Sequence, residues 1–204
     1  MRKTIMRLLN MNDLGYLRRT KLKGHQCIGK GSFCSVFAEH ENSSKVTKVT
    51  TDRLSYYMLT DGFWASVRES VGIAFPEVIE DHGGVGVSRG LDVYMVDVER
   101  LMPIATTENR RAVRRISKEY EVFLRKYPNK YRRMSDRLNF ASIDFCQKKS
   151  EQEDEPYQEV FDALLDFVSN FGGALDLTPS NFMQRADGSL VWNDVVFDAK
   201  TYLQ

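Results

Sequence analysis

The sequence predicts an α+β protein in which a β-rich half, ending near Leu101, precedes an α-rich half. Runs of β-branched and aromatic residues separated by polar or glycine turns dominate from Leu22 to Leu101. Beyond Pro103, apolar residues recur at helical spacing until a final short hairpin. We therefore expect an N-terminal lobe over residues 1–100 and a C-terminal lobe over residues 101–204, forming one domain with a cleft between them.

The first half contains the expected sheet. Residues 1–20 read as a short helical preface, and "HQCIGKGSFCSVFAEH" predicts a strand, a turn and a second strand. The β-branched segment "SSKVTKVT" predicts a third strand. Residues 52–70 carry apolar side chains at helical spacing, with a break at Gly62. Two more strands, "FPEVIEDHG" and "LDVYMVDVERL", are expected around a glycine-rich turn.

The second half is expected to be mainly helical. Residues 107–126 predict one helix, and the polar stretch 127–155 predicts a loop with helical pieces. Pro156 suits the first position of an amphipathic helix that stops at Gly172-Gly173. Two short strands near 181–184 and 190–192 follow, and the Asp187-Gly188 pair between them is a strong hairpin signal.

Composition excludes several classes of function. A net charge of +1 gives no general attraction to nucleic acid, so no direct nucleic-acid binding is expected. No run approaches the roughly 18 apolar residues of a membrane helix, so we expect no membrane association and a cytoplasmic location. The three cysteines form neither a disulfide framework nor a metal-ligand pair. His25, His40 and His82 show no metal-ligand spacing and read as surface or structural residues.

The first motif that carries chemistry is Gly29-Lys30-Gly31, between two expected strands. Two glycines there would let backbone N–H groups approach a phosphate without interference from a Cβ atom. Most such pairs are plain hairpin turns. The pattern is not a P-loop, because no Gly-Lys-Ser/Thr opens a helix after it. It is not a dinucleotide fingerprint either, because a strand follows.

Lys48 lies in the middle of the next expected strand, between valines at 46 and 49. A lysine inside a β-branched strand needs an anionic partner or a route to water. An edge-strand lysine facing solvent is the plain interpretation when the residue is considered alone. Its position after the glycine motif favours a place in the cleft.

Three polar residues follow late in the chain. Asp176 and Asn181 stand five positions apart in "DLTPSNFM", where an acid can orient a hydroxyl and an amide oxygen can bind a metal. Asp194 follows the last expected strand, and its carboxylate suits Mg²⁺. Each residue alone is more often a turn former or a cap. Their joint occurrence, after the glycine motif and Lys48, is the stronger signal.

These motifs give the chain a resemblance to the protein kinase family over roughly residues 24–198. "IGKGSFCSV" looks like the glycine loop, "VTKV" the lysine strand, "VYMVDVERL" the hinge, "DLTPSNFM" the catalytic loop and "VWND" the metal-binding segment. The chain is most similar to the small early Ser/Thr protein kinases of short-tailed bacteriophages. The resemblance implies a minimal two-lobed protein kinase-like fold with a truncated C-terminal lobe. It also implies ATP and Mg²⁺ as cofactors and the host bacterial cytoplasm as location.

The resemblance also implies a role for each matching residue. Asp176 would orient the attacking hydroxyl, Lys48 would bind the α- and β-phosphates, and Asn181 and Asp194 would hold Mg²⁺. The other nucleotide contacts would come from the loop over the phosphates, from side chains around the adenine and from the backbone of the hinge: Gly29, Lys30, Gly31, Ser32 and Phe33; Ile28, Val36, Val46 and Met183; Glu99 and Leu101.

The sequence departs from the family pattern at several points. Cys34 replaces the third glycine of the loop, Ala174-Leu175 stand where His-Arg is common, and Val195-Val196 replace Phe-Gly. The carboxylate partner of Lys48 is open among Asp52, Asp61 and Glu69. The usual activation segment and the later helices have no counterpart after Asp194.

Three functions are compatible with these features. The chain is expected to be a kinase that phosphorylates host proteins on Ser or Thr to redirect host functions. The alternative is a catalytically inactive kinase-like protein that binds and inhibits a host target such as RNA polymerase. A small-molecule phosphotransferase is a third option, although such enzymes usually retain a His where Ala174 stands.

The basic segment 110–137 is the candidate surface for host transcription machinery, with a solvated helix face as its plain interpretation. Its aromatic residues, at helical spacing, are expected to make core contacts.

Overall fold

The computed structural model describes residues 9–203, apart from the side chains of Phe63 and Trp64. It is a mixed α and β structure, as expected, and it divides into two compact units. The first unit contains the residues up to Tyr56 together with Glu77–Arg100. The second contains Tyr57–Pro76 and the chain from Leu101 onward. Residues 57–76, expected in the N-terminal lobe, therefore belong to the second unit.

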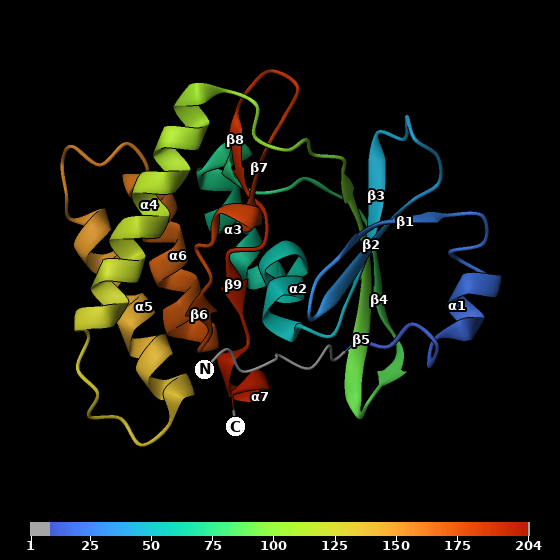
Figure 1. Cartoon of the computed structure of the whole chain (residues 1–204), viewed down its shortest axis with the longest axis horizontal. Helices are drawn as coiled ribbons and strands as arrows, with labels where there is room; N and C mark the ends of the chain where they lie inside the picture. The colour runs from blue at the N-terminus through green and yellow to red at the C-terminus, as the bar shows by residue number, and fades with distance from the viewer. Residues whose placement is uncertain (1–8, 204) are drawn as a thin grey trace. The chain divides into compact units, whose positions relative to one another are not determined.

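The first unit is built on a five-stranded antiparallel sheet (Figure 1). Its strands are β1 (Gln26–Lys30), β2 (Cys34–Ala38), β3 (Lys45–Thr50), β4 (Val78–Ser88) and β5 (Leu91–Glu99), in the spatial order β1-β2-β3-β5-β4. β3 is central, and every residue in it except Lys45 is buried. The five strands expected from the sequence are therefore all present.

Leucines from the N-terminal preface complete the core of this sheet. Leu14, Leu17 and Leu22 lie in and around the short helix α1 (Gly15–Arg19), and they pack with Leu9 against the sheet. The sheet contributes four side chains to this cluster: Phe37, Val49, Val93 and Met95. Covering one face with leucines explains why the preface is apolar. Its first eight residues lie outside the described part of the chain.

The turn between β4 and β5 differs from the expectation. The glycine-rich segment does not turn: Gly83, Gly84 and Gly86 lie inside β4, where the register with β5 shifts at bulges. The chain reverses instead at Arg89-Gly90, whose φ angles are 52° and 79°. Two consecutive positive φ angles are typical of a two-residue hairpin turn. Glycine is common at bulges, so these glycines indicate an irregular strand and not the end of a strand.

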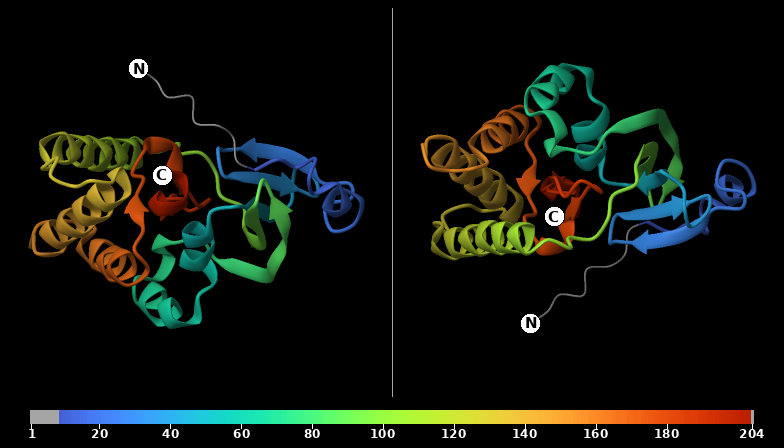
Figure 2. Two further views of the ribbon diagram at one scale, coloured as in Figure 1. Left: turned by 90° about the horizontal axis from the view of Figure 1, so that it is seen from below. Right: turned by 90° about the horizontal axis from the view of Figure 1, so that it is seen from above.

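Helices dominate the second unit. Figure 2 shows α4 (Thr107–Lys126), α5 (Met134–Ser150) and α6 (Gln158–Phe171) side by side in both views. α4 has the predicted bounds, and Thr106 caps it by accepting the backbone N–H of Asn109. α6 begins two residues after Pro156 and ends where expected, with Gly172 in the left-handed region at φ 78°. Residues 52–70 form α2 (Arg53–Thr60) and α3 (Gly62–Ser70), which adjoin at the predicted break.

The stretch 127–155, expected as a loop with helical pieces, contains one continuous helix, α5, over residues 134–150. Its buried face is made largely of small or weakly apolar residues, including Ser135, Ala141, Ser142 and Cys146. A face of this kind gives a weak apolar stripe, which is why the sequence pattern concealed the helix. Phe145 is its one large apolar side chain that is buried.

An aromatic core joins these helices to the final hairpin. The ring centroid of Trp192 lies 5.3 Å from that of Phe161 and 5.0 Å from that of Phe182, while Phe145 lies 5.7 Å from Phe161. Trp192 belongs to β8 (Leu190–Trp192) and Phe182 to β7 (Phe182–Gln184), the hairpin that the sequence predicted. This core therefore holds the hairpin of β7 and β8 against the helices.

Three short elements near the end of the described chain were not expected. β6 (Ala174–Leu175) pairs with β9 (Val196–Phe197), and α7 (Ala199–Tyr202) follows with Asp198 as its cap. Of the helices in residues 9–203, none combines the length and the apolar character needed to cross a membrane.

Candidate functional site

In the second unit, the structure brings together Asp176, Asn181 and Asp194. Asp176 directly follows β6, and its backbone N–H donates to the carbonyl oxygen of Val195 at 2.8 Å. The carbonyl oxygen of Asn181 accepts the N–H groups of Asn193 at 2.9 Å and Asp194 at 3.2 Å. Backbone bonds thus fasten the loop that carries Asp176 to the segment that carries Asp194.

The side chain of Asn181 is oriented by the same loop. Its Nδ2 donates to the backbone carbonyl oxygen of Asp176 at 2.9 Å. A carbonyl oxygen only accepts hydrogen bonds, so this contact fixes which end of the amide is nitrogen. The amide oxygen Oδ1 therefore has the role of acceptor, which is the role that a metal ligand needs.

The electrostatics of this loop show two neighbouring carboxylates. Burial raises the pKa of Asp176, hydrogen bonds from Asn181 and Thr178 partly offset that rise, and the negative charge of Asp194 adds to it. Repulsion between two carboxylates favours either a shared proton or a cation. Two carboxylates and an amide oxygen are hard donors of the kind that Mg²⁺ prefers, so these residues fit the implied metal.

Two buried side chains, Ser142 and Tyr120, hold Leu175, the residue before Asp176. The sequence did not single them out for the site. Ser142 Oγ accepts the backbone N–H of Leu175 at 2.9 Å and lies 3.0 Å from the hydroxyl of Tyr120. That hydroxyl also donates to the carbonyl oxygen of Leu175 at 3.4 Å. Burial raises the pKa of Tyr120, which keeps its proton available for donation. Tyr120 was predicted only as a core residue; Ser142 lay in the expected loop.

The β6–β9 pairing occupies the position where the family's His-Arg would stand. Ala174 pairs with Phe197 and Leu175 with Val196, and both residues of β6 are buried. Three of the four departures noted at 174–175 and 195–196 therefore belong to one small ladder, and the fourth, Val195, accepts the N–H of Asp176 beside it. Backbone hydrogen bonds there hold the loop that carries Asp176, and such bonds need no particular polar side chain.

The glycine motif lies in the first unit, at the turn from β1 to β2. Neither Gly29 nor Gly31 has a positive φ, and a Cβ atom on either would meet only ordinary contacts, at 3.5 Å and 3.8 Å. The fold therefore does not require glycine at these two positions. Glycine at these positions would, however, allow another molecule to approach the backbone closely.

The rest of this loop is tied to the end of β3. The carbonyl oxygen of Phe33 accepts the N–H of Thr51 at 2.9 Å and both threonine hydroxyls, of Thr50 and Thr51, at 3.3 Å. Lys30 is exposed, Ser32 is half-buried, and Ile28 is exposed beside them. Val36 is half-buried in β2, and Val46 is buried in β3.

Lys48 is buried on β3, and its Nζ donates to Ser55 Oγ on α2 at 2.9 Å. Ser55 was not among the partners considered from the sequence. Asp52, which was, caps α2: its Oδ1 accepts the N–H groups of Leu54 and Ser55 at 3.0 Å. The α2 cap therefore holds the backbone of the residue that Lys48 contacts.

The expected adenine contacts are divided between the units. Glu99 ends β5 in the first unit, and its N–H already donates to the carbonyl oxygen of Glu77 at 3.0 Å. Leu101 and Met183 belong to the second unit, where Met102 and Gln184 exchange two backbone hydrogen bonds of 2.9 Å. Contact of all these residues with one nucleotide stays a prediction.

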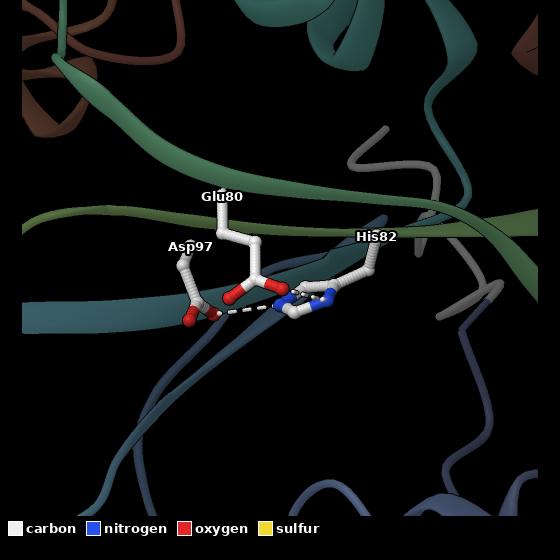
Figure 3. Close-up of side chains that lie close together, drawn as sticks. All are labelled: Glu80, His82 and Asp97. Atoms are coloured by element: carbon white, nitrogen blue, oxygen red, sulfur yellow. Dashed lines mark ion pairs between the residues drawn. The ribbon is translucent and has the colours of Figure 1, made fainter.

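A second polar cluster lies on the sheet of the first unit (Figure 3). His82 Nε2 lies 3.4 Å from Asp97 Oδ1, and His82 Nδ1 lies 3.5 Å from Glu80 Oε1. These three residues could hold a metal ion, which the sequence spacing of His82 did not indicate, because the contacts form across β4 and β5.

Lys45, however, contacts Asp97 at 2.6 Å, and Thr47 donates to it at 2.7 Å. Burial would raise the pKa of Asp97, but these two contacts outweigh burial and lower it. The cluster is therefore an ion-pair network.

No family model matches the sequence, and no curated protein matches it. Among solved structures, choline kinase LicA from Streptococcus pneumoniae is similar with a TM-score of 0.35 and 11% identity, over 93% of this chain and 71% of that one. LicA in complex with AMP gives 0.33 and 10% over the same shares. Because both TM-scores are below 0.5, neither structure serves as evidence for the activity of this chain.

Proposed function

We propose that this chain is an ATP- and Mg²⁺-dependent phosphotransferase with a protein kinase-like arrangement, acting on Ser or Thr of host proteins. The observation that carries the proposal is the loop in which Asp176, Asn181 and Asp194 come together. Further support comes from Lys48, which is buried on β3. The turn before it contains Gly29 and Gly31, two positions at which the fold itself does not require glycine. The host substrate and the bacteriophage setting rest on the sequence resemblance.

In this proposal, each residue has a separate role. The hydroxyl oxygen of the substrate attacks the γ-phosphorus, the bond to the β-phosphate oxygen breaks, and ADP leaves. Asp176 orients the hydroxyl and accepts its proton, a role that suits a carboxylate with a raised pKa. Asn181 and Asp194 would hold Mg²⁺, which supplies neutralisation of phosphate charge. Lys48 and the N–H groups of residues 29–33 would bind the phosphates.

The direct test measures transfer of labelled γ-phosphate from ATP in the presence of Mg²⁺, with bacterial lysate as acceptor. The wild-type chain should label protein with acid-stable phosphate, and phosphoamino-acid analysis should identify Ser or Thr. Asp176→Asn, Lys48→Met and Asp194→Asn should each lower the rate by a factor on the order of 10²–10³. Asp162→Asn, an exposed position on α6, is the matched control and should keep the wild-type rate.

The outcomes separate the candidate functions. Thermal stabilisation by ATP and Mg²⁺ without transfer to any acceptor would reject the enzyme and leave the inactive, target-binding alternative. ATP turnover that labels only small molecules would reject the protein substrate and keep the phosphotransferase. Unchanged rates in the Asp176 or Asp194 variants would show that the site assignment is wrong.

A further inference from the structure

The second unit contains a groove of about 750 Å³ along α4 and α5, which lie side by side in Figure 2. The groove combines apolar and basic side chains from both helices and from the turn after α4. Its lining comprises Arg115, Lys118, Glu119, Val122, Phe123, Lys126, Tyr127, Pro128, Phe145, Lys148, Lys149 and Gln152. A volume of this size is in the range of sites that hold small ligands or several side chains.

The floor of the groove is apolar. Val122 keeps 38% of its surface exposed there, and Phe123 lies beside it in the lining. The ring of Phe123 lies 5.3 Å from that of Phe145 and 5.6 Å from that of Tyr127. These aromatic contacts hold the floor in place, so an apolar side chain entering the groove would meet a preformed surface.

The acidic side chains at the groove are already neutralised. Arg115 binds Glu155 through two contacts of 2.8 Å, and Lys149 contacts Glu155 at 2.9 Å and Glu119 at 2.5 Å. Burial would raise the pKa of Glu155, but these hydrogen bonds outweigh burial and lower it to about 2. Two bases and two acids therefore cancel, and Arg115 and Lys149 act as structural parts of the groove.

The rim carries the charge that remains. Lys118, Lys126 and Lys148 are exposed, and none of the three forms an ion pair with a residue of the described chain. Three unneutralised ammonium groups thus surround an apolar floor. Partners that match such a surface carry several negative charges around a large apolar group.

We propose that this groove docks an acidic segment of a partner protein, with one large apolar side chain of that segment seated on Val122 and Phe123. Charge complementarity at the three lysines selects the acidic character, and the apolar floor selects a side chain over a bare polyanion. The proposal does not depend on phosphoryl transfer. It also extends the docking surface beyond the basic segment 110–137, because Phe145 and Lys148 of α5 line the same groove.

Fluorescence anisotropy with a synthetic probe tests this proposal. The probe is a short fluorescein-labelled peptide of Asp and Glu around a central Phe-Leu pair, and its matched control has Ser-Ser at the centre. We expect saturable binding of the Phe-Leu peptide, about tenfold tighter than binding of the Ser-Ser peptide. The triple variant K118E/K126E/K148E should weaken binding about tenfold or more. Val122→Glu should remove the preference for the Phe-Leu centre.

The control variant K130E/R132E/R133E reverses three exposed charges nearby that do not line the groove. It should change the affinity by less than about twofold. Equal losses in the two triple variants, no effect of the peptide centre, or no saturable binding would overturn the proposal. Displacement of the probe by duplex DNA as effectively as by unlabelled peptide would overturn it too. Circular dichroism melts of each variant verify that the fold is kept.

Discussion

At the residue scale, the central feature is Asp176, whose ionised carboxylate is destabilised by its surroundings in the folded protein. Asp176 is largely buried, and Asp194 adds negative charge beside it. A structural aspartate would normally have its charge neutralised by a base, as Lys45 neutralises that of Asp97. Strain of this electrostatic kind is characteristic of functional sites, where activity and stability make opposite demands.

This conflict predicts that Asp176→Asn gains stability while it loses activity. The raised pKa means that Asp176 favours folding fully only below the ordinary aspartate pKa near 3.8, and that this contribution is lost as pH rises through the folded-state value. At pH 7 the neutral amide should therefore unfold at a higher temperature than the wild type. Thermal melts at pH 7, with Asp162→Asn as control, measure it. A lower melting temperature would contradict the electrostatic argument.

At the element scale, the ends of α6 and α4 show how local chemistry sets boundaries. Gly172 ends α6 in the left-handed region, and Thr106 begins α4 as a cap. Both boundaries follow from residue preferences that hold in most proteins. Such signals are local, so they are legible in a single sequence.

Gly172→Ala should destabilise the protein by about 1 kcal/mol, because alanine is strained at a φ of 78°. The added Cβ would lie 3.3 Å from Lys200 Nζ, the far end of a flexible side chain, so the backbone accounts for the effect. Gly62→Ala is the control, since Gly62 begins α3 without a positive φ and has open space around its Cβ position. Urea unfolding of both variants gives the comparison; equal stabilities would refute the cap argument.

The sequence predicted the strands of the sheet, the end of α6 and the final hairpin, because each depends on local pattern. It indicated only helical pieces where the continuous helix α5 lies, because the buried face of that helix is mostly small residues, and it missed the β6–β9 ladder. Two-residue strands have no periodicity, so nothing local marks them. For the site, the proximity of Asp176, Asn181 and Asp194 was expected from the resemblance. The support from Ser142 was not, because that serine lay in an expected loop.

At the scale of the whole molecule, part of the stability in acid depends on the ion-pair network around Glu155. Glu155 joins Arg115 of α4 to Lys149 of α5, just before α6 begins. Its pKa is lowered to about 2, so its contribution is complete above the unfolded value near 4.5 and is lost as pH falls toward 2. The wild type should therefore lose stability over that interval.

Glu155→Gln should cost roughly 2–3 kcal/mol at pH 7, because it leaves Lys149 buried with Glu119 as its remaining acidic partner. The variant should also show a smaller loss of stability between pH 4.5 and 2 than the wild type. Glu153→Gln, at an exposed neighbouring position, should match the wild type in both respects. Urea unfolding across this pH range measures both effects. A parallel pH dependence in wild type and variant would assign the acid sensitivity to other groups.

The β6–β9 ladder has a consequence for the order of events during synthesis. Asp176 leaves the ribosome some twenty residues before Val196, the partner that β6 requires. In that interval α4, α5 and α6 are complete, but the loop that bears Asp176 lacks its anchor. The nascent chain should thus form these helices before the loop that bears Asp176 is held in place. On the proposed function, a newly made molecule would lack phosphotransferase activity until its last strand has emerged.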